Sequence, residues 1–185
     1  MISVSVFWIT RFVIDWAVWF WFSDKRQWRA YLPTCIFASW ISYIVEAVMV
    51  HYPLWSYSGH KLMSLNVNGF GIYIVFVFLF IQRLPKQRKL GNLLKYWFIW
   101  TGIAISIELF HLLLGHITYH SWWNIGYSYL ADWLLLLLFY KFHLFVTESR
   151  SSISQQGLTT TSWQTNQTGV KDVPLKEVKP QDSTL

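Results

Sequence analysis

The stretch "YWFIWTGIAISIELFHLLLGHI", residues 96–117, decides the class of fold. A helix needs about 20 apolar residues to cross the hydrocarbon core of a bilayer, and this stretch is long enough. Only Glu108, His111 and His116 interrupt it with groups that are costly to place in hydrocarbon. We therefore predict a transmembrane helix whose ionisable side chains have a structural or functional role that offsets this cost.

The composition extends this prediction to most of the chain. Of its 185 residues, 54% are hydrophobic, 20% are aromatic and only 13% are charged, whereas soluble domains carry about 25% charged residues. The net charge of +6 does not indicate nucleic-acid binding, because the basic residues flank apolar runs as they do in membrane proteins. The predicted class is an all-α integral membrane protein with no nucleic-acid partner.

Five apolar segments form the predicted transmembrane bundle of residues 1–146. The segment at 67–83 is short, so whether it fully crosses the bilayer stays open. Residues 147–185 are rich in Ser, Thr and Gln, a composition that predicts a disordered polar tail. The five predicted spans are residues 3–23, 31–52, 67–83, 96–117 and 126–146.

The loops alternate in basic charge along the chain. Lysines and arginines gather after the first, third and fifth segments, whereas the loop at 53–66 holds one lysine and the loop at 118–125 holds none. By the positive-inside rule this alternation predicts a multi-pass protein of the cell membrane, with the N-terminus outside and the C-terminus in the cytoplasm. The lipid bilayer is then its first partner.

Polar residues inside the predicted spans form the first candidate site. Arg11 and Asp15 are four residues apart and share a helix face, as do Glu108 and His111 at a spacing of three. Ionisable groups in spans normally point into the bundle and pair there. We expect Glu108 to hydrogen-bond Arg11, His111 or a polar group of residues 31–52. The candidate cluster in the middle and outer half comprises Arg11, Asp15, Glu46, Glu108, His111 and Asp132.

Two interpretations of this cluster remain open. Polar contacts between membrane helices stabilise the bundle by about 0.6 kcal/mol on average, so the cluster could serve packing alone. Alternatively, it is a site for proton transfer, a metal ion or acid–base chemistry.

The loops between spans hold a second group of candidates. Their aromatic and polar side chains suit a rim that recognises a lipid headgroup or a ligand of the cell envelope, although an ordinary interfacial aromatic belt is the favoured interpretation. The outer-rim candidates are Trp55, Tyr57, His116, Trp123 and Tyr127.

Motifs for metal, cofactor and nucleophilic chemistry are missing from the sequence. Glu108-x-x-His111 is a single pair, whereas di-iron bundles need two such pairs and two further glutamates. Cys35 is the only cysteine, and neither His-Glu-x-x-His nor Gly-x-x-x-x-Gly-Lys occurs. No Gly-x-Ser-x-Gly marks a nucleophile. We therefore expect no metal and no cofactor.

Short motifs between residues 26 and 146 resemble a known family. They are the basic and aromatic run 26–31 with Leu32-Pro33-Thr34, "HYPLWSY" at 51–57, "RLP" at 83–85, and Glu108, Gly115, Tyr119, Trp122, Trp123 and Tyr127-Ser128. The chain resembles small uncharacterised multi-helix membrane proteins of spore-forming Gram-positive bacteria. The resemblance implies a bacterial cell membrane and four or five helices, but no activity.

The sequence therefore favours a structural or accessory protein of the cell envelope that is not an enzyme. The alternatives are a small proton-linked transporter and an outer-leaflet lipid-modifying enzyme that uses the Glu/His/Arg cluster. A homo-oligomer and a partner membrane protein both remain open.

Overall fold

The computed structural model describes residues 4–59, 61–87 and 89–167, and this part of the chain is mostly helical. Five helical segments are long and apolar enough to cross a membrane, as the sequence predicts. The elements are α1 (Val4–Phe22), η1 (Lys25–Gln27), α2 (Trp28–His51), β1 (Trp55–Tyr57), α3 (Lys61–Val67), η2 (Asn68–Ile72), α4 (Tyr73–Gln82), α5 (Leu90–Leu113), β2 (Ile117–Tyr119) and α6 (Ile125–Gln167).

The chain divides into two units, residues 1–148 and 149–185. The first unit holds the five apolar helical segments. In the second unit the backbone of α6 stays helical to Gln167, and residues 168–185 lie outside the described residues. The disordered tail expected at 147–185 therefore stays a prediction.

The fourth segment ends earlier than the sequence predicts. We expected a helix to residue 117, but α5 ends at Leu113. Gly115 has a φ of +70°, its N–H bonds the Leu112 carbonyl at 3.0 Å, and the His116 N–H bonds the His111 carbonyl at 2.8 Å. This pair of bonds is a Schellman motif, in which a left-handed glycine ends a helix. His116 therefore lies outside the helix.

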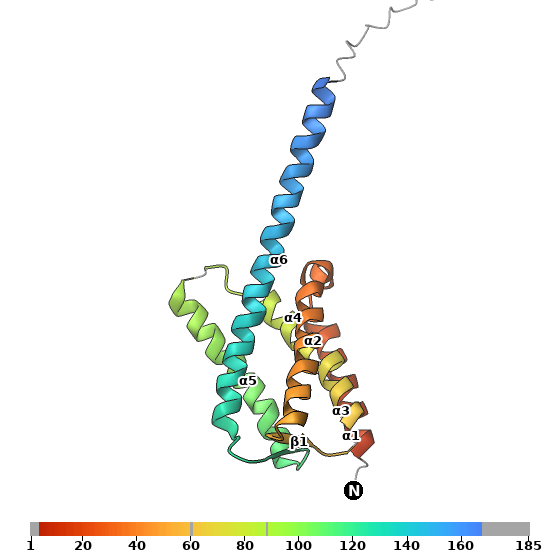
Figure 1. Cartoon of the computed structure of the whole chain (residues 1–185), viewed down its shortest axis with the longest axis vertical. Helices are drawn as coiled ribbons and strands as arrows, with labels where there is room; N and C mark the ends of the chain where they lie inside the picture. The colour runs from red at the N-terminus through yellow and green to blue at the C-terminus, as the bar shows by residue number, and fades with distance from the viewer. Residues whose placement is uncertain (1–3, 60, 88, 168–185) are drawn as a thin grey trace, which may run out of the picture. The chain divides into compact units, whose positions relative to one another are not determined.

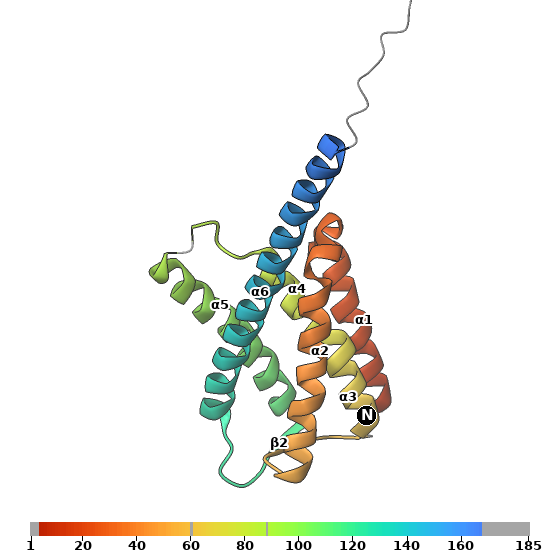
Figure 2. The ribbon, with the colours of Figure 1, turned by 45° about the horizontal axis from the view of Figure 1, so that its top comes forward.

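A two-stranded sheet, which the sequence analysis did not predict, follows this turn. Strands β1 and β2 pair antiparallel, with Trp55 opposite Tyr119 and Tyr57 opposite Ile117. Figures 1 and 2 show the strands at the same end of the first unit as the start of α1. We call this the sheet end. The sheet ties the loop after α2 to the loop after α5, so both predicted outer loops lie at one end.

The third segment is the central helix, because most of its side chains are buried whereas most of those in the other four segments are not. Its π-helical turn η2 carries two glycines that allow close approach. A Cβ on Gly69 would lie 2.7 Å from the Tyr43 ring, and one on Gly71 would lie 2.9 Å from a carboxylate oxygen of Asp15. The short predicted segment 67–83 thus belongs to a longer helical run, Lys61–Gln82.

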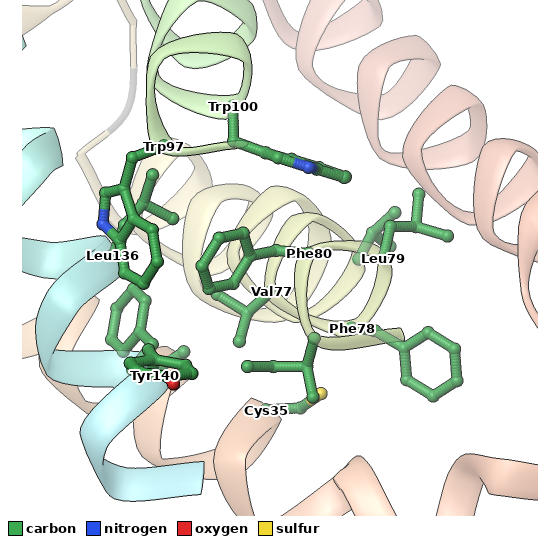
Figure 3. Packing of buried hydrophobic residues seen from close by; sticks show 13 residues of the cluster. Cys35, Val77, Phe78, Leu79, Phe80, Trp97, Trp100, Leu136 and Tyr140 are labelled. Atoms are coloured by element: carbon green, nitrogen blue, oxygen red, sulfur yellow. The ribbon is translucent and has the colours of Figure 1, made fainter. Parts of the chain in front are cut away.

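The apolar core surrounds α4. Figure 3 shows Phe80 directed toward Trp97 and Trp100 of α5, while Phe78 points away from them. The Phe80 ring lies edge-on to both indoles, with centroids 5.7 and 5.8 Å apart, a preferred geometry for aromatic pairs. Cys35 is fully buried in the same cluster. This aromatic packing fills the part of the bundle around α4 that lies away from the sheet end.

Candidate functional site

A cavity of about 390 Å³ lies in the half of the first unit nearer the sheet end. This volume falls within the range of small-molecule sites, about 300–1,000 Å³. Side chains of α1, α2, η2, α4, α5, α6 and both strands line it. Four members of the predicted intramembrane cluster lie on its wall: Arg11, Glu108, His111 and Asp132.

Arg11 and Asp15 form the ion pair that their spacing predicts. The Arg11 Nε lies 3.9 Å from the Asp15 Oδ2, and both side chains are largely buried. The Arg11 guanidinium also lies 5.6 Å from the centre of the Trp8 ring. Asp15 does not line the first cavity. It lines a second one of about 620 Å³ between α1, α4 and α5, which Arg11 and His111 share.

Glu108 faces the cavity, but its partners differ from those expected. Its Oε1 accepts hydrogen bonds from the Tyr119 hydroxyl at 2.7 Å and the Ser128 hydroxyl at 2.8 Å. The Trp123 indole N–H donates to the same Ser128 oxygen at 2.9 Å. The expected bond to Arg11, His111 or a polar group of residues 31–52 was wrong, because the Schellman turn brings β2 back beside α5.

His111 is 3% exposed, and its ring stacks on Trp8 at a centroid distance of 5.9 Å. The His111 Nδ1 is buried and has no hydrogen-bond partner among the described residues. Buried polar atoms nearly always find a partner, so this nitrogen marks a place where one is missing.

Asp132 is the second carboxylate on the cavity wall. Within the part of the chain that the structure describes, no Lys or Arg forms an ion pair with Asp132 or with Glu108. Glu46 does not line the cavity. Its charge interacts with Lys61 and with Tyr57 and Tyr73 of the cavity wall.

The outer-rim candidates fall into two groups. Trp55, Tyr57 and Trp123 line the cavity, and burial raises the pKa of the Tyr57 hydroxyl. His116 and Tyr127 do not line it. The His116 Nδ1 lies 2.9 Å from the Ser58 hydroxyl, and its ring stacks on a phenylalanine of α1. Tyr127 is 45% exposed.

Sequence reasoning missed four polar residues of this site. Tyr119 and Ser128 bind Glu108, and Asn68 and Tyr73 line the cavity from the central helix. Asn68 offered a signal, since it begins the polar and glycine-containing stretch "NGFG" within an apolar segment. Tyr119 and Ser128 stand among the short motifs of the family resemblance, which implied no role for them, and Tyr73 resembles an ordinary packing residue.

Among residues 4–59, 61–87 and 89–167, no three His, Cys, Asp or Glu side chains gather closely enough to hold a metal ion. The wall combines two carboxylates, one guanidinium and one imidazole with aromatic and aliphatic side chains. This arrangement can bind a small molecule that has both a polar and an apolar part.

Comparison with protein-family models, with curated proteins and with solved structures found no match to this chain. The family resemblance drawn from short motifs therefore stays a prediction, and the site is interpreted from its own geometry.

Proposed function

We propose that this chain is an accessory protein of the cell envelope that binds a small amphiphilic ligand within the membrane. The observation that carries the proposal is the cavity of about 390 Å³, which combines charged groups with apolar walls. Apolar residues of α4 and α6, such as Val77, Leu136 and Phe139, supply the part of the wall that suits an alkyl chain.

The polar groups of the cluster that lack partners support a ligand-binding role rather than a role in helix packing alone. A cluster that served only to hold helices together would pair its charges internally. Here Asp132 accepts no hydrogen bond from any described residue, one oxygen of Glu108 remains without a hydrogen bond, and the His111 Nδ1 is unpartnered. A ligand in the cavity would supply partners for the two carboxylates.

The two alternative functions receive less support. A proton-linked transporter needs a polar path to both faces of the membrane. The second cavity runs from Arg11, Asp15 and His111 to Arg83 at the opposite end, but its lining between these residues is mostly apolar. An acid–base enzyme built on this cluster would pair Glu108 with His111. Glu108 instead forms its hydrogen bonds with Tyr119 and Ser128. The π-helical turn η2 favours transport or catalysis, since such turns are frequent at functional sites.

We further propose that the sheet end faces the outside of the cell membrane and that the C-terminus lies in the cytoplasm. This orientation rests on the basic residues, which concentrate in the loops at the opposite end. The ligand would then enter from the outer leaflet or from outside.

A thermal-unfolding assay tests ligand binding directly. Cys35 is the only cysteine and is fully buried, so a thiol-reactive fluorogenic dye reports unfolding of the purified protein. Hexylamine, hexanol and hexanoate are suitable six-carbon probes. At least one should raise the unfolding temperature, because a ligand that binds only the folded state stabilises it.

Two variants, each replacing an alanine by phenylalanine, make the test specific for the cavity. Ala131 lines the cavity, so Ala131→Phe should fill space and abolish the stabilisation. Ala47 is exposed on α2, so Ala47→Phe should keep it. If no probe stabilises the unmodified protein, or if both variants respond alike, the proposal is wrong.

A further inference from the structure

We infer that the ligand of this cavity carries an ammonium group, bound between Glu108 and Asp132. The inference rests on the proposed function and names the chemistry of its ligand. The ligand is an organic cation with an apolar chain, either a free amine or the amine-bearing headgroup of a lipid.

The charges on the wall favour a cation. Glu108 and Asp132 both line the cavity. No described Lys or Arg forms an ion pair with either carboxylate, so neither has a direct ionic partner among the described residues. An ammonium between them would supply that partner.

Arg11 is the one cation on the same wall, and it is already engaged. Its guanidinium lies 3.9 Å from Asp15 and faces the Trp8 ring at 5.6 Å. The Arg11 guanidinium therefore interacts with side chains of its own helix, α1. Glu108 of α5 and Asp132 of α6 form no ion pair with any described residue.

Aromatic side chains complete a wall suited to a cation. Trp55 and Trp123 line the cavity with their rings 5.1 Å apart, and Tyr57 and Tyr73 line it as well. The negative face of an aromatic ring attracts ammonium groups, more strongly where water is excluded.

The unpartnered nitrogen of His111 is an independent sign of a ligand. His111 is 97% buried and lines the cavity, and its Nδ1 lacks a hydrogen-bond partner among the described residues. The same side chain also lines the second cavity, so it marks this end of the bundle without assigning a particular hydrogen bond to the ligand.

The probes of the thermal-unfolding assay test this inference, with affinities measured by titration in nanodiscs of phosphatidylcholine and phosphatidylglycerol. Hexylammonium should bind at least tenfold more tightly than hexanol or hexanoate. Glu108→Gln and Asp132→Asn together should remove this preference, and a cooperative unfolding transition of the double variant without any probe shows that it still folds. Asp24→Asn is the matched control, because Asp24 lies in the turn after α1, at the opposite end from the sheet, and does not line the cavity; it should behave like the unmodified protein.

The outcomes separate the two proposals. If hexanol or hexanoate binds as tightly as hexylammonium, or if the double variant keeps the preference, the cavity is a binding site but the ammonium inference is wrong. If none of the three probes binds, the proposed function itself fails.

A second arm identifies the source of the amine. Phosphatidylethanolamine added to the nanodiscs should weaken hexylammonium binding if a lipid headgroup is the ligand, and should leave it unchanged if the ligand is a free amine. Tetramethylammonium should bind more weakly than methylammonium, because it has no N–H group to donate to the two carboxylates. Equal binding of these two ions would contradict a hydrogen-bonded ammonium between Glu108 and Asp132.

Discussion

The hydrogen bonds around Glu108 predict the effect of its replacement. Glu108→Leu removes two hydrogen bonds, those from Tyr119 and Ser128. Polar contacts between membrane helices contribute about 0.6 kcal/mol on average and about 1.7 kcal/mol at most. The free energy of unfolding should therefore fall by about 1–2 kcal/mol.

The loss should stay within this range because the two donors retain other partners. The Tyr119 hydroxyl lies 3.4 Å from the Ser128 hydroxyl, and Ser128 still accepts from Trp123. Glu108→Gln should lose much less stability than Glu108→Leu, since the amide oxygen accepts the same two bonds.

Unfolding in mixed micelles of rising dodecyl sulfate content measures these differences. A double-mutant cycle with Tyr119→Phe isolates one bond, and its coupling energy should be about 0.6 kcal/mol. A Glu108→Leu protein as stable as the unmodified one would refute the reasoning. Equal losses for the leucine and glutamine variants would show that charge, not hydrogen bonding, matters there.

Three further predictions concern packing, topology and pH. Gly69→Ala should destabilise the protein by about 1–3 kcal/mol, because its Cβ would lie 2.7 Å from the Tyr43 ring, whose hydroxyl bonds Asn66. Gly102→Ala should not, since nothing lies within 4 Å of its Cβ; chemical unfolding of the pair compares them. Tyr52→Cys should react with an impermeant thiol reagent in whole cells and Lys86→Cys only after permeabilisation, while the native thiol stays buried; the reverse pattern would invert the proposed orientation. Burial lowers the pKa of the His116 imidazole, so protonation favours the unfolded chain, and stability should fall as the pH drops below about 6.5. Melting curves of a His116→Gln variant should show a weaker pH dependence, and an unchanged one would contradict this.

The five helices could be predicted from the sequence because the constraint that produces them is local. A backbone in hydrocarbon must satisfy its own hydrogen bonds, so each long apolar run becomes a helix whatever surrounds it. Residues 3–23 and 126–146 were predicted as spans, and the structure has helices at Val4–Phe22 and from Ile125 onward. The Arg11–Asp15 pair was also predictable, since its spacing lies within one helix.

The partners of Glu108 and the cavity depended on the tertiary structure. Tyr119 reaches Glu108 because the turn at Gly115 reverses the chain and β2 pairs with β1, a contact between loops about sixty residues apart. Glycines in η2 allow the central helix to approach α1 and α2 closely. Helical periodicity states which side chains share a face, but it does not state which other helix that face meets. For this reason the sequence determined that Glu108 needed a polar partner, and only the packing of the bundle decided which one.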